Sequence, residues 1–347
     1  MNGSSAYSAL TRWDAAWYRR IADNGYGDTR VAPDGRLLPD FAFFPLYPAA
    51  ERFVSAVTSL ATVDAGLLVS GVSSVVAAAG IYRVGERLHG ARTGLVLVCL
   101  WSSLPVAIVQ SMAYAESLFT ALGAWTLYAL LLHRYTTAGA VAVLAGLTRP
   151  LGVAVVAAVL AATIVRLLSL RRPPVNVGHR AAVGVAGPLL GAVLAPMGLV
   201  GYMAYVAWSR GSPRAYLDVT EQWGNGFDGG RRFIAWTTSQ FLGGPVVTGT
   251  ALLTGVILLG LAVRHTAPPR YPMFIFVFTL MAVAVTLSTE SYFGSKPRYL
   301  VPAFTLLLWP AVLTRRLKTW WLIALLFGLA ALSAAYGAIW LLGPGPP

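Results

Sequence analysis

The chain alternates between long apolar runs and short polar breaks over most of its length. A helix needs about 20 predominantly apolar residues to cross a bilayer, and many of the runs approach that length. The pattern predicts about ten membrane spans, at Ala61–Tyr82, Gly94–Met112, Glu116–Leu132, Ala138–Leu147, Leu151–Leu168, Ala181–Trp208, Gly244–Val263, Met273–Ser288, Leu300–Leu313 and Trp320–Leu342. We therefore expect an all-α polytopic membrane protein.

The polar segments between these spans define two parts of the chain. Residues 1–60 form a first loop with interfacial helices, and residues 61–347 form the transmembrane domain. That domain carries further loops on the same side at 209–243 and 289–299. The fourth span is too short to cross alone, so we expect it to form a broken pair with the fifth around Thr148–Pro150, against protein or a wet cavity.

Composition supports this class. Hydrophobic residues make up 57% of the 347 residues and charged residues only 11%, whereas soluble domains carry roughly 25% charged residues. Mean hydropathy is +0.66. The first ten residues lack the basic start and apolar core of a cleavable signal peptide, so none is expected. Cys99 is the only cysteine, which excludes an intrachain disulfide or a thiolate cluster.

The net charge of +13 is distributed unevenly. With the N-terminus outside, the inner loops hold 13 of the 26 Lys and Arg with a single acid, Glu86, for a net +12; the outer face carries +1. The inner bases are Arg83, Arg87, Arg92, Arg134, Arg166, Arg171, Arg172, Arg180, Arg264, Arg270, Arg315, Arg316 and Lys318. This positive-inside pattern indicates topology and contact with lipid headgroups, not nucleic-acid binding.

All four histidines, His89, His133, His179 and His265, also fall in the inner loops. Acid–base chemistry on the outer face must therefore come from carboxylates. A tight transition-metal site is not expected there, although carboxylates leave a divalent cation open.

Asp14 is the first candidate. Trp13, Trp17 and Ile21 recur at helical spacing, which predicts a short interfacial helix beginning near Asp14. An acid in the first turn of a helix is favoured by the macrodipole. The same acid, shielded by Trp13 at a membrane surface, is also placed to act as a general base.

The other outer segments allow two interpretations. Around Tyr47 an aromatic and proline cluster fits either a membrane-interface anchor or part of a site. Asp218 and Trp223 suit binding of a sugar, or an ordinary solvated loop. Lys296 and Arg298 either pair with a lipid phosphate or extend toward the interface from a helix end.

Two charged residues lie at or within apolar runs: Glu116, next to Tyr114, and Arg149. Ionisable groups at such depth are costly and usually line a cavity or pair with each other. We therefore interpret both as functional.

These residues together resemble the PIG-V family of mannosyltransferases (GPI mannosyltransferase 2-like), in its bacterial, actinobacterial form. The similar pieces occur in the family's order over roughly residues 10–310. They are Trp13-Asp14, Ile21-Ala22, Gly25-Tyr26, Phe43-Phe44-Pro45-Leu46-Tyr47-Pro48, Tyr114-Ala115-Glu116-Ser117-Leu118-Phe119, Leu147-Thr148-Arg149-Pro150, Gly152, Arg298-Tyr299 and Pro302.

The resemblance implies a GT-C fold and transfer of mannose from polyprenyl-phosphate mannose to a lipid or glycan hydroxyl, with inversion. The active face would be extracytoplasmic and the location the plasma membrane. Asp14 would be the base, and Arg298, Lys296 and Arg149 would bind the donor phosphate. Substrate contacts would come from Trp13, Glu116, Tyr114, Tyr47, Asp218, Trp223 and Tyr299. No nucleotide sugar is expected, and no cofactor beyond a divalent cation.

Family members place a transmembrane helix before the Trp-Asp loop, and Asp14 lies close to the start of this sequence. Either the start codon is assigned too late or that helix is lacking. Two other functions stay open: a lipid or lipid-linked-sugar flippase, and a non-catalytic assembly subunit. Neither internal repeats nor a second broken helix pair, which a transporter would show, is visible in the sequence.

Overall fold

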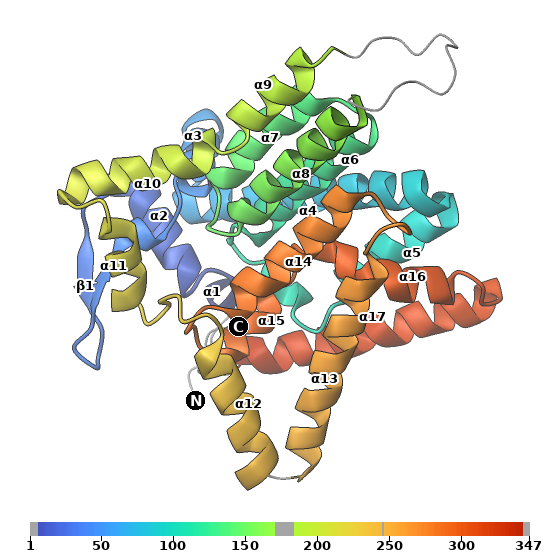
Figure 1. Ribbon diagram of the computed structural model, residues 1–347. Coiled ribbons are helices and arrows are strands. Elements are labelled where there is room, and N and C mark those ends of the chain that lie inside the picture. The colour runs from blue at the N-terminus through green and yellow to red at the C-terminus, as the bar shows by residue number, and fades with distance from the viewer. Residues whose placement is uncertain (1–5, 171–183, 245, 343–347) are drawn as a thin grey trace.

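The computed structural model describes residues 6–170, 184–244 and 246–342, a body of helices with one small strand hairpin (Figure 1). The first segment contains α1 (Ala6–Leu10), α2 (Asp14–Asn24), β1 (Thr29–Val31), β2 (Leu37–Pro39) and α3 (Leu46–Thr58). Then come α4 (Thr62–His89), α5 (Ala91–Ser102), α6 (Glu116–Leu131), α7 (Tyr135–Gly146) and α8 (Gly152–Leu170). Arg171, Arg172, His179, Arg180 and the start of the span predicted from Ala181 lie outside the described residues.

The second half begins with α9 (Ala186–Leu194), α10 (Met197–Arg210), α11 (Ala215–Gln222), α12 (Arg231–Gly243) and α13 (Val246–His265). It ends with α14 (Met273–Leu287), α15 (Lys296–Tyr299), α16 (Leu308–Thr314) and α17 (Thr319–Leu342). Short 3-10 turns lie at Asp40–Ala42, Ala107–Gln110, Phe293–Ser295 and Phe304–Leu307.

The predicted class, an all-α polytopic membrane protein, is confirmed. In the described ranges five helical segments are long and apolar enough to cross a membrane: α4, α8, α9 with α10, α13 and α17. Four more apolar helical segments are shorter, at Ala91–Ser102, Tyr135–Gly146, Met273–Leu287 and Phe304–Thr314. The count of about ten crossings stays a prediction.

The centre of the body is α6, which packs along α4 and α7 and contacts α8. Small residues allow the close approach of the next layer, α7 against α9 and α10. A Cβ at Gly139 would collide with the backbone of Gly191, and one at Gly146 with that of Leu199. Glycine at these positions therefore fixes the distance between the layers.

The predicted broken pair is present. α7 ends at Gly146 and α8 begins at Gly152, and the chain reverses through the irregular Thr148–Pro150 segment. Proline cannot continue the helical hydrogen-bond ladder, and it disfavours helical backbone at the residue before it. The break also receives the first segment, because the amide of Leu46 donates to the carbonyl of Leu147 at 2.9 Å.

Three predicted spans are not single helices. The span predicted at Gly94–Met112 ends as α5 at Ser102, and that at Leu300–Leu313 splits into a 3-10 turn and α16. Pro105 lies shortly after the end of α5, and Pro302 lies just before the 3-10 turn; proline lacks an amide donor for the helical ladder. Between α9 and α10 the helix is interrupted next to Pro196.

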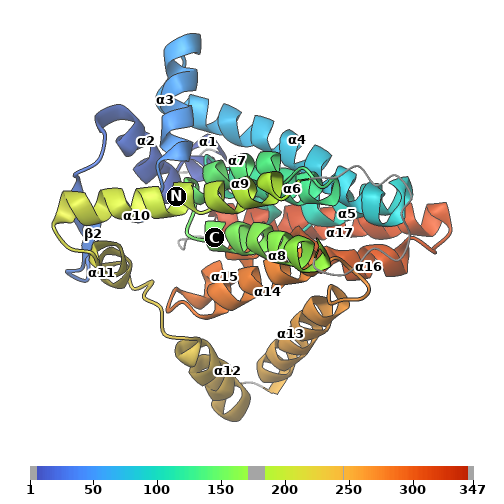
Figure 2. The same cartoon turned by 45° about the horizontal axis from the view of Figure 1, so that its top comes forward.

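The first segment packs on the helical body. The predicted short helix is α2, which ends before Gly25 at a φ of 82°, and β1 and β2 form an antiparallel hairpin after it. α2 and α3 both contact α4. In contrast, α12 and α13 form a hairpin that stands away from the body in both views (Figures 1 and 2).

Candidate functional site

A cavity of about 280 Å³ opens at the end of the body where α7 ends and α6 and α8 begin. Its walls come from segments far apart in the sequence: α2, residues 42–44, the break between α7 and α8, α11 with the loop after it, the end of α14, and residues 289–299. Such a concave site with a few convergent polar groups is the usual form of a small-molecule site.

One wall of the cavity is a chain of ion pairs. Arg298 Nη2 lies 2.8 Å from Asp14 Oδ2, and Arg298 Nε lies 3.2 Å from Glu116 Oε1. Arg149 Nη1 pairs with the same Glu116 oxygen. The order Asp14–Arg298–Glu116–Arg149 therefore joins four distant parts of the sequence into one network.

Burial differs along this network. Glu116 is 1% exposed and lies behind the cavity surface, whereas the side chains of Arg298, Arg149 and Asp14 are 5%, 13% and 24% exposed. Removing one partner from a buried ion pair leaves an uncompensated charge and is strongly destabilising. Glu116 thus fixes both arginines from behind, and Asp14 is the member that faces the cavity most openly.

Aromatic rings support the guanidinium groups. The ring of Tyr299 lies 5.1 Å from the guanidinium carbon of Arg298 and 5.4 Å from that of Arg149. On the inner side, the fully buried ring of Tyr114 lies 5.1 Å from Arg298. Aromatic faces attract cations at these distances, so the arginines are held by rings as well as by Glu116.

Asp14 is presented by a strained backbone. It begins α2, and the preceding Trp13 has φ 57° and ψ −115°. A bulky residue rarely adopts positive φ, and such conformations cost about 1–3 kcal/mol and cluster at functional sites. Tyr18 follows four residues after Asp14 on the same face of α2, and both side chains line the cavity.

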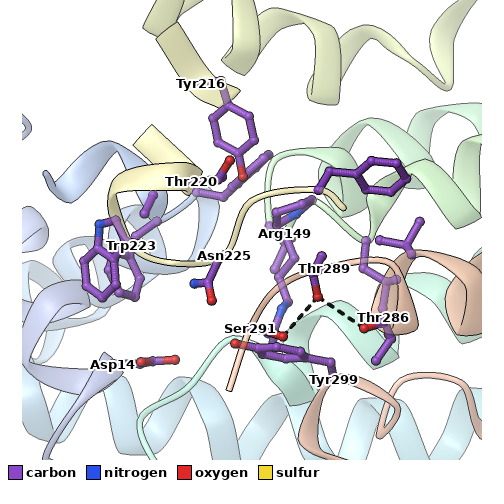
Figure 3. Close-up of a pocket in the computed structure, with 18 of the residues that line it drawn as sticks. Asp14, Arg149, Tyr216, Thr220, Trp223, Asn225, Thr286, Thr289, Ser291 and Tyr299 are labelled. Carbon is purple, nitrogen blue, oxygen red and sulfur yellow. Dashed lines mark hydrogen bonds between the residues drawn. The ribbon is translucent and has the colours of Figure 1, made fainter. Parts of the chain in front are cut away.

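Arg149 is presented by the helix break. Thr148 beside it is fully buried, and its hydroxyl donates to the carbonyl of Leu144 at 2.8 Å. Because the backbone turns at this point, the Arg149 side chain can extend into the cavity (Figure 3).

The other described residues that line the cavity, which we call the neutral wall, carry no charged side chain. Trp223 packs edge-on against Trp17 and Phe43, and its indole donates to the carbonyl of Pro39 at 2.9 Å. Asn225 also lines the cavity, with its side-chain amide among the labelled groups of the close-up (Figure 3). Hydroxyl groups of this wall belong to Tyr216, Thr220, Thr286, Thr289 and Ser291.

This neutral wall is formed where two loops meet. Phe227 and Thr289 form an isolated antiparallel bridge, and the amide of Glu290 donates to the carbonyl of Gly226 at 2.7 Å. Two buried hydroxyls, of Tyr216 and Thr286, have no hydrogen-bond partner among the described residues. Buried polar groups are normally satisfied, so these two are available to a ligand.

Lys296 lies behind the neutral wall. Its amine donates to the carbonyls of Thr286 and Thr289, at 3.1 and 2.8 Å. Burial lowers the pKa of this amine below the usual lysine value. The contacts tie the end of α14 to α15, so Lys296 supports the wall and does not line the cavity.

The predicted residues fall into three groups. Asp14, Arg149, Arg298, Tyr299 and Trp223 line the cavity. Glu116 and Tyr114 lie directly behind it, and fully buried Tyr47 packs against Tyr18. Three residues lie elsewhere: Trp13, Lys296 and the exposed Asp218 of α11.

Sequence reasoning missed Tyr18, Tyr216 and Thr286. For Tyr18 a signal existed, because it lies one helical turn after Asp14. The other two look like ordinary loop or helix residues in the sequence.

A divalent cation has little support in this arrangement. Within the described ranges no group of three or more His, Cys, Asp or Glu is gathered as metal ligands would be. Among the described residues that line the cavity, Asp14 is the one carboxylate, and a guanidinium already pairs with it.

No protein-family model and no curated protein matches the sequence. Solved structures do match in fold. ArnT from Cupriavidus metallidurans, with undecaprenyl phosphate bound, is 16% identical with a TM-score of 0.56, over 96% of this chain and 59% of that one. The archaeal oligosaccharyltransferase AglB from Archaeoglobus fulgidus, in complex with an inhibitory peptide and a dolichol-phosphate, is 12% identical with a TM-score of 0.51, over 99% and 53%.

The chain therefore has the GT-C fold of membrane glycosyltransferases. It spans between half and three-fifths of the length of these two proteins.

Proposed function

We propose that the protein is a membrane glycosyltransferase that moves mannose from polyprenyl-phosphate mannose to a hydroxyl of a lipid or glycan. The observation that carries this proposal is the meeting of one carboxylate and two guanidinium groups at a single cavity. A base and an anion clamp are what transfer from a phosphate-linked donor requires.

In this proposal Asp14 accepts the proton of the acceptor hydroxyl. The hydroxyl oxygen forms its bond to the anomeric carbon from the side opposite the phosphate, so configuration is inverted. The bond from that carbon to the phosphate oxygen breaks, and its electron pair leaves with polyprenyl phosphate. Arg298 and Arg149 stabilise the charge on the leaving phosphate.

The lipid carrier is supported by the comparisons. ArnT is solved with undecaprenyl phosphate and AglB with a dolichol-phosphate, so this fold accommodates polyprenyl phosphates in two distant proteins. Mannose as the sugar rests on the PIG-V resemblance. The neutral hydroxyl and amide wall suits a sugar without a charged substituent.

An extracytoplasmic active face in the plasma membrane belongs to the same proposal. The cavity lies where α6 begins and where α14 ends. Basic residues instead lie at the ends of α4 and α13, the helices that precede α5 and α14 in the chain. Because short cytoplasmic loops are rich in Lys and Arg, that basic side would be cytoplasmic.

The test is transfer of labelled mannose from polyprenyl-phosphate mannose into lipids of host membranes by the purified protein. Its Asp14→Asn variant is the comparison, and Asp23→Asn, the same change at an exposed site on the same helix, is the matched control. Label in a lipid or glycan with parent and control, and none with Asp14→Asn, supports the proposal. Donor-independent movement of lipid would favour a flippase, and bound donor without transfer by any form would favour a non-catalytic subunit.

A further inference from the structure

Asp14, Arg298, Glu116 and Arg149 form what we call the ionic wall. Among the described residues, Arg298 is the cation that contacts both of its carboxylates. Its Nη2 pairs with Asp14 and its Nε with Glu116. Among the described residues neither Nε nor the third nitrogen, Nη1, has a hydrogen-bond partner, and both are buried; Nε lies at ion-pair distance, 3.2 Å, from Glu116. A guanidinium carries five N–H donors in a fixed fork and binds phosphate best through two of them. Arg298 therefore has one donor nitrogen available and one occupied by Asp14.

The charges of the wall are balanced before any ligand binds. Asp14 and Glu116 face Arg149 and Arg298, two acids against two bases. A phosphate that enters brings further negative charge into a site of low exposure, where like charges repel strongly. For Arg298 to bind this phosphate through two of its nitrogens, one carboxylate has to give up its contact with that guanidinium.

Only Asp14 is free to do so. Glu116 is 1% exposed, and both arginines contact the same one of its oxygens. If the Glu116 side chain moved away, two buried cations would lose their contact with it. Asp14 lies in the first turn of α2 with its side chain 24% exposed to the cavity. A rotation of its side chain would exchange the guanidinium for a group in the cavity.

We propose that the donor phosphate and Asp14 compete for Arg298, so that binding of the donor releases Asp14 to act as the base. The phosphate first takes the available Nη1 and then Nη2, while Glu116 keeps the guanidinium in place through Nε. This inference rests on the proposed function and adds the order of its steps: the donor binds first, and Asp14 becomes free to act as the base afterwards. Without donor, Asp14 stays paired and does not activate a hydroxyl; with donor, it turns to the acceptor.

The test compares binding of two lipid probes, undecaprenyl phosphate and undecaprenol, to the detergent-purified full chain. The forms compared are the parent, Asp14→Asn and the control Asp23→Asn. If Asp14 competes with the phosphate, its neutral variant binds undecaprenyl phosphate about five- to tenfold more tightly, the range of a moderate coupling between two ligands of one group. Undecaprenol affinity changes less than about twofold, and the control matches the parent for both lipids.

Three results would overturn the inference. Unchanged or weaker binding of undecaprenyl phosphate by Asp14→Asn would mean that the pair with Arg298 persists in the complex. An equal increase in affinity for undecaprenyl phosphate and undecaprenol would mean that the substitution loosens the packing of the cavity in general. A parent that does not distinguish the phosphate from the alcohol would contradict the polyprenyl-phosphate donor itself, and with it the proposed function. The first two leave that function standing.

Discussion

The two walls of the cavity are built in opposite ways. The ionic wall takes its four charged residues from α2, α6, the α7–α8 break and α15, and each is fixed by another charge or by an aromatic ring. The neutral wall comes from two loops joined by one short bridge, and it offers an amide and several hydroxyls. The first is charged and held by ion pairs, and the second is uncharged and held by contacts between two loops.

This difference suggests a division of labour. Groups that stabilise charge in a transition state must be held in place beforehand, because reorganising them would cost part of their effect. Groups that recognise a sugar need only offer hydrogen bonds of the right kind. We therefore assign the chemistry to the ionic wall and recognition to the neutral wall.

The largest expected effect comes from Asp14 itself. Asp14→Asn should lower the turnover of mannose transfer about 10³-fold, because general-base catalysis contributes about 10²–10⁴-fold. Donor binding should persist, since both arginines remain. Turnover within tenfold of the parent would contradict the assignment, and Asp23→Asn serves as the control.

Next is the residue that holds the ionic wall from behind. Glu116→Gln leaves two buried guanidiniums with one carboxylate, and it should lower the free energy of unfolding by about 3 kcal/mol. Unfolding of the purified protein by denaturant, followed by tryptophan fluorescence, measures this. Asp40→Asn, a buried acid outside the cavity, is the comparison for a general effect of removing a buried carboxylate.

A smaller effect is expected on the neutral wall. Asn225→Ala removes one or two hydrogen bonds to the sugar. The donor should lose about 1.4 kcal/mol of binding free energy, which raises its KM about tenfold. Turnover at saturating donor should stay near that of the parent. A fall in turnover with unchanged KM would place Asn225 among the groups that act on the transition state.

The smallest effect belongs to Asp218. Its side chain is exposed on α11 and does not line the cavity. Asp218→Asn should therefore change transfer less than about twofold, as surface substitutions usually alter stability within about 0.5 kcal/mol. A larger loss would mean that the acceptor extends over α11 beyond the cavity.

The sequence was most informative where a charged residue lies at or within an apolar run. Glu116 and Arg149 are indicated because a charge at or within an apolar run is costly unless it pairs or functions. Arg298 is indicated, like Lys296, as a cation directly before a span. Asp218 is indicated by a loop that combines charges with aromatic residues, and nothing in the sequence indicates that its side chain does not line the cavity. For Lys296 the sequence offers a lipid phosphate or the interface as partner, whereas its amine donates to carbonyls at the end of α14.

The fold was predictable in class but less so in detail. Apolar runs identified the helical segments, yet Pro105 and Pro302 interrupt two of them where hydropathy alone continues. The neutral wall could not be predicted, because Asn225 and Thr286 line one cavity through a bridge between Phe227 and Thr289, which are 289 − 227 = 62 residues apart in sequence. Pairing at such distance depends on tertiary packing, which local patterns do not encode.

The most direct test of the division between the walls is a single-turnover experiment on Asp14→Asn and Asn225→Ala. Donor binding and transfer of bound donor are measured separately on the same preparations. The account predicts that Asp14→Asn binds donor and does not transfer it, whereas Asn225→Ala binds weakly but transfers what it binds at the parental rate. If Asn225→Ala transfers bound donor as poorly as Asp14→Asn does, the two walls share the chemistry and the account is contradicted.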